Sequence, residues 1–197
     1  HTNRIPDDDL PYAALLRHVL SLVDTEHYSY SDLTSEINLN TGGLSLGITS
    51  YVNLKKLPDF TGAFSAEVRV LYEKLDFGFE ILSEILTRSK FSDEKRLGEI
   101  LKTTRSRMKM KLENGSHSAA VARATSYFSP TSAYNDCTGG IRYYQFLDDV
   151  IREFEKDPKP LIAKLEEVSK KLFTKENIFS VHQWQDPSSQ KDLLKLL

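Results

Sequence analysis

Two segments of the chain change the spacing of their apolar residues, and this change constrains the fold more than any other feature. Apolar and polar residues alternate over residues 44–52 and again over residues 64–70. A period of two places successive side chains on opposite faces, which predicts two half-buried strands. The polar loop between them contains Pro58 and Gly62. We therefore expect an antiparallel hairpin with a long loop.

Elsewhere, apolar residues recur three or four positions apart, which is typical of helices with one buried face. Asp7, Asp8 and Asp9 suit the start of the first helix, Ser29 and Asp32 resemble a capping box, and Ser92 is predicted as an N-cap. A short apolar run at residues 178–181 predicts a third strand. Helices are expected over residues 10–23, 30–41, 81–86, 93–114, 118–127, 140–154 and 161–172.

This order of elements predicts an α+β fold, an antiparallel sheet with helices packed on one face. Three strands are few for so many helices, so we expect the sheet to be completed by strands that precede His1. The chain begins without methionine and stops inside an apolar-periodic stretch. We therefore expect a piece of a longer protein, with one α+β unit over residues 1–182. Residues 183–197 are expected to be a linker and the truncated start of the next segment.

Charge and composition exclude several classes of partner. The 26 Lys and Arg nearly cancel the 28 Asp and Glu, for a net charge of -2, so no global field attracts nucleic acid. The single cysteine, Cys137, cannot form an internal disulfide, which indicates a reducing compartment and predicts a cytoplasmic location. No apolar run reaches the ~18–20 residues that a membrane span needs, so no membrane partner is expected.

The five histidines are not spaced to hold a metal ion. No H-x-x-x-H or H-x-x-E-H pattern places two imidazoles on one helix face. We interpret His18 as a packed or partly exposed helix residue and His27 as a loop residue. The prediction is therefore no catalytic and no metal-binding residue, with the substrate-binding residues unknown.

Two other patterns have both a chemical and a structural interpretation. Cys137 lies before Gly139 and Gly140, where nearby amides would favour a nucleophilic thiolate. No histidine partner is identifiable, so a small buried cysteine beside a turn is favoured. Ser116 and His117 are adjacent, but G-x-S-x-G is absent and a capped helix turn explains them. The Thr-Gly-Gly triplets at residues 41–43 and 138–140 lack a P-loop context and are interpreted as helix ends.

The only cationic concentration lies on the predicted helix 93–114, at Lys102, Arg105, Arg107, Lys109 and Lys111. Three of these, Lys102, Arg105 and Lys109, share one stripe of the helix. A solvated helix face is favoured for this stripe, and an interface for an acidic partner is the alternative.

One aromatic group, Tyr143, Tyr144 and Phe146, is expected to pack on the sheet. We expect its tyrosine hydroxyls to reach the surface.

A family resemblance is carried by two stretches of sequence. Residues 10–52 read LPYAALLRHVLSLVDTEHYSYSDLTSEINLNTGGLSLGITSYV, and residues 139–150 read GGIRYYQFLDDV. Both resemble the presequence-protease branch of the pitrilysin/insulysin (insulinase-type) zinc metallopeptidases, and the likeness extends over roughly residues 5–182. The resemblance implies four homologous repeats of the LuxS/processing-peptidase-like metallohydrolase type, arranged as two halves that close around a peptide. It also implies that zinc is held in the first repeat by H-x-x-E-H and a distal glutamate.

Within this family the chain most resembles the third repeat, and its motif position is degenerate. Ala14-Leu15-Leu16-Arg17-His18 aligns with H-x-x-E-H but keeps only the last residue. Alanine offers no lone pair, and a permanently protonated arginine can neither activate a zinc-bound water nor lie comfortably beside a dication.

The leading hypothesis is a non-catalytic structural domain that lines the substrate chamber of a larger zinc-dependent endopeptidase. Zinc belongs to the parent's first repeat, and the partners are the other repeats of the parent and an unstructured peptide. The alternative is a degenerate interaction module or complex subunit without peptidase activity.

Overall fold

The computed structural model of the protein describes residues 1–56 and 59–181. Within these residues the chain is mostly helical with a small antiparallel sheet of two strands, which agrees with the α+β prediction. The strands are β1 (Gly43–Val52) and β2 (Phe60–Arg69). The helices are α1 (Leu10–Val19), α2 (Tyr30–Asn40), α3 (Leu75–Thr87), α4 (Glu94–Asn114), α5 (Ser116–Thr125), α6 (Pro130–Gly139), α7 (Ile141–Phe154) and α8 (Lys159–Leu172).

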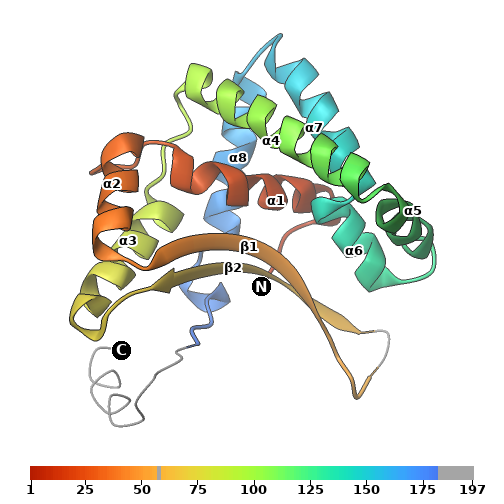
Figure 1. Cartoon of the computed structure of the whole chain (residues 1–197), viewed down its shortest axis with the longest axis horizontal. Coiled ribbons are helices and arrows are strands. Elements are labelled where there is room, and N and C mark those ends of the chain that lie inside the picture. Colours follow the sequence, from red (N-terminus) through yellow and green to blue (C-terminus); the bar gives the residue numbers. More distant parts are fainter. Residues whose placement is uncertain (57–58, 182–197) are drawn as a thin grey trace.

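The two strands form the hairpin that the alternating pattern predicts. Their register runs from Gly43 opposite Arg69 to Val52 opposite Phe60. Leu44, Leu46 and Phe64 share one face of the hairpin and pack against the hydrophobic core. The helices lie on one side of this long curved ribbon, with α2 and α3 toward one end and α5 and α6 toward the other (Figure 1).

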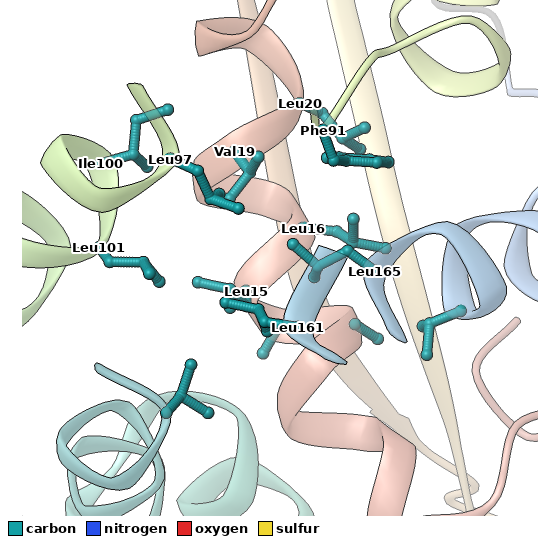
Figure 2. Close-up of a cluster of buried hydrophobic side chains, with 14 of the residues drawn as sticks. Leu15, Leu16, Val19, Leu20, Phe91, Leu97, Ile100, Leu101, Leu161 and Leu165 are labelled. Atoms are coloured by element: carbon teal, nitrogen blue, oxygen red, sulfur yellow. The ribbon is translucent and has the colours of Figure 1, made fainter. Parts of the chain in front are cut away.

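Helix α1 lies at the centre of the core. Its side chains Ala13, Ala14, Leu15, Leu16 and Val19 have no solvent exposure, as expected for a helix that is apolar on nearly every side. Strand β1 and helices α4, α6 and α8 all pack against it. Figure 2 shows leucines of α8, Leu161 and Leu165, and of α4, Leu97 and Leu101, meeting those of α1.

The predicted third strand at residues 178–181 is wrong. A single 3-10 turn, Lys175–Asn177, follows α8, and residues 178–181 have no regular secondary structure. Phe179 is 78% exposed and Val181 79% exposed. No strand among the described residues pairs with this short run, and an unpaired apolar segment does not form a stable strand. The predicted linker and truncated helix at residues 183–197 lie outside the described residues.

Helix α6 was not predicted, because its sequence, PTSAYNDCTG, has no apolar periodicity. Local signals start it instead: the Ser129 side chain accepts a hydrogen bond from the Ser132 amide, and Pro130 occupies the first turn. Proline is favoured there because its missing N–H would have no helical partner. Its neighbours α1, α5 and α7 then hold it in place.

Element boundaries differ from the expectations at several places. Strand β2 starts at Phe60 rather than near residue 64, so Gly62 lies in the strand and not in the loop. Asp93, not Ser92, caps α4 by accepting a hydrogen bond from the Arg96 amide. The predicted helix 10–23 is α1 to Val19 and then a 3-10 turn, Leu20–Leu22. Helix α3 starts at Leu75 rather than near Ile81. The Ser29 cap of α2 is confirmed, since its side chain accepts from the Asp32 amide.

No helix in the described ranges is both long enough and apolar enough to cross a membrane.

The central position of α1 gives a stability prediction. Leu165 of α8 is fully buried, so Leu165→Ala leaves a cavity against α1 and should lower the free energy of unfolding by about 2–5 kcal/mol. Leu39 of α2 is 79% exposed, so Leu39→Ala should change it by less than about 0.5 kcal/mol. Urea denaturation followed by circular dichroism measures both. Equal losses in the two variants would contradict this account of the core.

Candidate functional site

The candidate site is the polar edge of α1, where the sequence resembles a metal-binding motif. Positions 14 and 18 lie one turn apart and therefore share a helix face. Ala14 is completely buried and presents only a methyl group there. His18 is partly buried. A helix face that binds zinc through this motif needs two imidazoles, and this face has only that of His18.

Arg17, at the position that the family resemblance aligns with the glutamate of H-x-x-E-H, contacts neutral groups. Its Nη2 donates a hydrogen bond to the carbonyl oxygen of Thr138 at 2.9 Å, and its Nε donates to Nε2 of His18 at 3.0 Å. Its guanidinium carbon lies 5.6 Å from the centre of the Tyr143 ring, within cation–π range. Burial lowers the pKa of Arg17, but an arginine stays protonated in proteins.

His18 is held neutral by its surroundings. Because its Nε2 accepts the hydrogen bond from Arg17, the neutral ring carries its proton on Nδ1. The ring stacks on Tyr143 with centroids 6.4 Å apart and planes at 29°. Burial, followed by the positive charges of Arg17, Arg107 and Lys111, lowers the pKa of His18 from 6.5 to about 4.

These residues do not fit a zinc ion. Zinc in proteins is held by three or four thiolate, imidazole or carboxylate donors. Here one neutral imidazole remains, its Nε2 lone pair is used by Arg17, and the charges that act on it are positive. Within residues 1–56 and 59–181, no three His, Cys, Asp or Glu side chains are gathered so that they could hold a metal ion. We therefore derive no zinc chemistry from this part of the chain.

Tyr143 corrects the expectation that the aromatic group packs on the sheet with its hydroxyls at the surface. Its side chain has no solvent exposure, and it packs against His18, Arg17 and Phe146. Helix α7 packs on α4, α6 and α8 rather than on the hairpin. The hydroxyl is buried without a hydrogen-bond partner among the described residues, and burial raises its pKa.

Cys137 lies on α6 and is partly buried. Burial raises the pKa of its thiol, which is the opposite of what a nucleophilic cysteine needs. Among the described residues, no hydrogen bond joins it to a histidine. The structure therefore favours the interpretation of Cys137 as a structural residue.

The predicted basic stripe on α4 is a solvated face whose charges are paired. The side chains of its members are half or more exposed, apart from Arg105 at 49%. Two of them reach across to carboxylates on or just after α7, and the third pairs along its own helix. The pairs are Lys102 with Glu155, Arg105 with Asp148, and Lys109 with Glu113.

An ion cluster that was not predicted surrounds Glu84, which is 5% exposed. Its carboxylate accepts hydrogen bonds from the amide of His27 at 2.9 Å and from Nη1 of Arg88 at 3.1 Å. Burial alone would raise the pKa of Glu84, but bonds from Thr25, His27 and Arg88 outweigh it and lower the pKa to about 2. This cluster joins α3 to the loop before α2, and no local pattern reveals contacts between positions so far apart.

The depressed pKa of His18 gives a pH prediction. The unfolded chain binds a proton at His18 near pH 6.5, whereas the folded chain does so only near pH 4. Stability is therefore fully present above about pH 6.5 and is lost as the pH falls toward 4. Between pH 6.5 and 4.5 we expect a loss of about 2 kcal/mol from this residue. Urea denaturation across this pH range measures it.

His18→Gln should flatten the pH dependence in this window, because no titrating ring remains. His117 is exposed on α5, so His117→Gln is the matched control and should keep the slope. A wild-type slope that survives in the His18 variant would show that another group causes it.

Comparison of the sequence with known proteins identifies its family. The family model described as peptidase M-16C associated matches residues 1–150. The chain is 32% identical over 179 residues to protein HypA of Clostridium perfringens. This match covers 90% of this chain and 18% of that protein. It is 27% identical over 191 residues to a mitochondrial presequence protease of Yarrowia lipolytica. This match covers 96% of this chain and 19% of that protein.

Similarity also extends to presequence protease 1 of Arabidopsis thaliana, named chloroplastic/mitochondrial, at 24% identity over 167 residues and 84% of this chain. The chain spans about a fifth or less of the length of these relatives. The resemblance to presequence proteases of the insulinase type is therefore confirmed for one region of such proteins. The chain belongs to the peptidase M-16C associated family.

Proposed function

We propose that this chain is a non-catalytic domain of a larger zinc-dependent endopeptidase, where it forms part of the wall of a chamber that encloses an unstructured peptide. Its family membership and its likeness to presequence proteases support this proposal. In it, residues 1–182 are one metallohydrolase-type repeat, the third of the parent, and zinc is held by the parent's first repeat.

The observation that carries the proposal is the state of α1. The helix keeps the buried central position of a scaffold element, with Leu15 and Leu16 fully enclosed. Its motif position presents Ala14 and a protonated Arg17 in place of a ligand and a base. A residue that cannot give up its proton cannot activate water, so the contribution of this helix is architectural.

One backbone contact joins the first residues of the chain to the hairpin. The Thr2 amide donates a hydrogen bond to the Gly62 carbonyl of β2 at 2.8 Å.

A chamber wall contributes to peptide hydrolysis without touching the metal. Enclosure excludes water from around the peptide and limits substrates by the volume that they occupy. The partners in this proposal are the other repeats of the parent chain and the enclosed peptide. The cytoplasmic location stays a prediction.

The alternative of an interaction module that uses the stripe of Lys102, Arg105 and Lys109 has no specific support. Those side chains form ion pairs with carboxylates of this same chain. An acidic partner would have to compete with these pairs.

The purified chain tests the proposal. We expect it to keep less than about 0.1 zinc per chain by elemental analysis after gel filtration, and to cleave no quenched fluorescent peptide, because the donor set is incomplete. The presequence protease of Yarrowia lipolytica is the positive control for the peptide assay. One zinc retained per chain, together with hydrolysis that EDTA abolishes, would contradict the proposal.

A further inference from the structure

A cavity of about 220 Å³ lies between α4, α7 and the start of α8. Helices α4 and α7 are on the side of the molecule away from the hairpin (Figure 1). The floor of the cavity is apolar and consists of the buried Leu101 and Ile151 with the half-buried Phe154 and Pro158. Because a cavity of about 150 Å³ holds a benzene-sized molecule, this one has room for a large side chain.

Gly98 of α4 keeps the cavity open. A methyl group added at this position would come within 3.3 Å of Cε1 of Phe154, which is closer than ordinary van der Waals contact. The absence of a side chain therefore lets the Phe154 ring lie against the backbone of α4, where the ring also lines the cavity. Glycine is otherwise an unfavourable residue inside a helix.

Two carboxylates and one ammonium group line the mouth of the cavity, from Glu94, Glu155 and Lys102. The Nζ atom of Lys102 lies 3.2 Å from Oε1 of Glu155, and both side chains are more than half exposed. Such an exposed pair is weak and rearranges easily. Glu94 is exposed and forms no ion pair with any described residue. The mouth therefore carries an excess of negative charge.

A more open hollow of about 620 Å³ continues along α7 and shares Glu155 with the cavity. Its other lining residues are Asp149, Arg152, Glu153 and Lys156, of which Asp149 and Arg152 form an ion pair with each other. A ligand seated in the cavity can thus extend over this polar surface. This extension favours a side chain that belongs to a polypeptide over a small free molecule.

We propose that the cavity between α4 and α7 binds an arginine side chain of a partner polypeptide. The methylene stem would pack on the apolar floor, and the guanidinium would lie against the Phe154 ring and pair with Glu94 and Glu155. Arginine suits this combination because its planar, weakly hydrated head stacks on aromatic rings and bonds carboxylates through two parallel hydrogen bonds. The inference goes beyond the proposed function and does not rest on it.

Other side chains match the cavity less well. An apolar side chain would fill the floor but would leave the carboxylate of Glu94 without a partner. An acidic side chain would meet the excess negative charge of the mouth. Lysine carries the right charge, but its compact and strongly hydrated ammonium group lacks the planar face that stacks on a ring.

Peptide titration of the full chain of residues 1–197, followed by nitrogen–proton NMR, tests this inference. Three capped peptides of glycine and serine differ only at the central position, which is arginine, lysine or citrulline. Citrulline has the shape of arginine without its charge. We expect the arginine peptide to bind at least about fivefold more tightly than the citrulline peptide and about twofold more tightly than the lysine peptide. The largest shifts should be those of the Gly98, Leu101 and Ile151 amides.

Matched variants locate the site. Glu94→Gln removes the unpaired carboxylate and should weaken binding of the arginine peptide about fivefold. Glu99 lies on the same helix, pairs with Arg96 and does not line the cavity. Glu99→Gln is therefore the control and should change binding by less than about twofold. Gly98→Met fills the cavity with a flexible side chain and should abolish binding. Circular dichroism melts confirm that each variant is folded.

One further variant separates stacking from charge. Phe154→Leu keeps the floor apolar but removes the aromatic ring. The preference for arginine over lysine should then disappear, whereas the preference for arginine over citrulline should remain, because the carboxylates are still present.

Three outcomes would overturn the inference: equal binding of the arginine and citrulline peptides, equal losses in the Glu94 and Glu99 variants, or unchanged binding in Gly98→Met. Free arginine that binds as tightly as the arginine peptide would assign the cavity to an amino acid rather than to a polypeptide. None of these outcomes alters the zinc and cleavage results, so failure here is distinguishable from failure of the proposed function.

Discussion

The enclosure of α1 is the constraint on which the rest of the structure depends. Because β1, α4, α6 and α8 all pack against this one helix, its apolar residues fix the positions of elements that are far apart in the sequence. Enclosure also leaves few positions at which α1 can carry polar chemistry. Arg17 and His18 occupy that edge, so the identity of these two side chains decides what the helix can do beyond supporting the fold.

At that edge the local charge opposes metal binding. A metal-binding helix needs lone pairs aimed at one point. Here the one imidazole accepts from Arg17, and the charges that act on it are positive. The same arrangement has a structural use, because the bond from Arg17 to the Thr138 carbonyl joins α1 to α6. Helix α1 thus contributes to the packing of its neighbours both through its apolar faces and through this polar edge.

Sequence patterns predicted those parts of the fold that depend on local periodicity. The hairpin and the helices now called α4, α7 and α8 each bury one regular face, so their spacing reveals them. Helix α6 was not predicted, because local caps and its neighbours stabilise it and it has no apolar stripe. The strand predicted at residues 178–181 was wrong, because apolar composition alone does not supply a partner strand.

The contacts of the candidate site were not predictable from local patterns. The substitutions at Ala14 and Arg17 are visible in the sequence and argue against a metal. Arg17 contacts Thr138 and Tyr143, which lie more than a hundred positions away in the chain. The ion pair of Arg105 on α4 with Asp148 on α7 joins residues about forty positions apart. No local pattern carries that information, since such contacts exist only once the helices have packed.

The most direct test of the central claim is nitrogen-15 NMR of the His18 ring at pH 7, recorded with and without stoichiometric Zn²⁺. If Arg17 holds this ring as described, the spectrum shows a proton on Nδ1 and a bare Nε2 that accepts a hydrogen bond, and both resonances stay in place when zinc is added. A large shift of either ring nitrogen on addition of one equivalent of zinc would show that His18 binds the metal, and it would contradict the account.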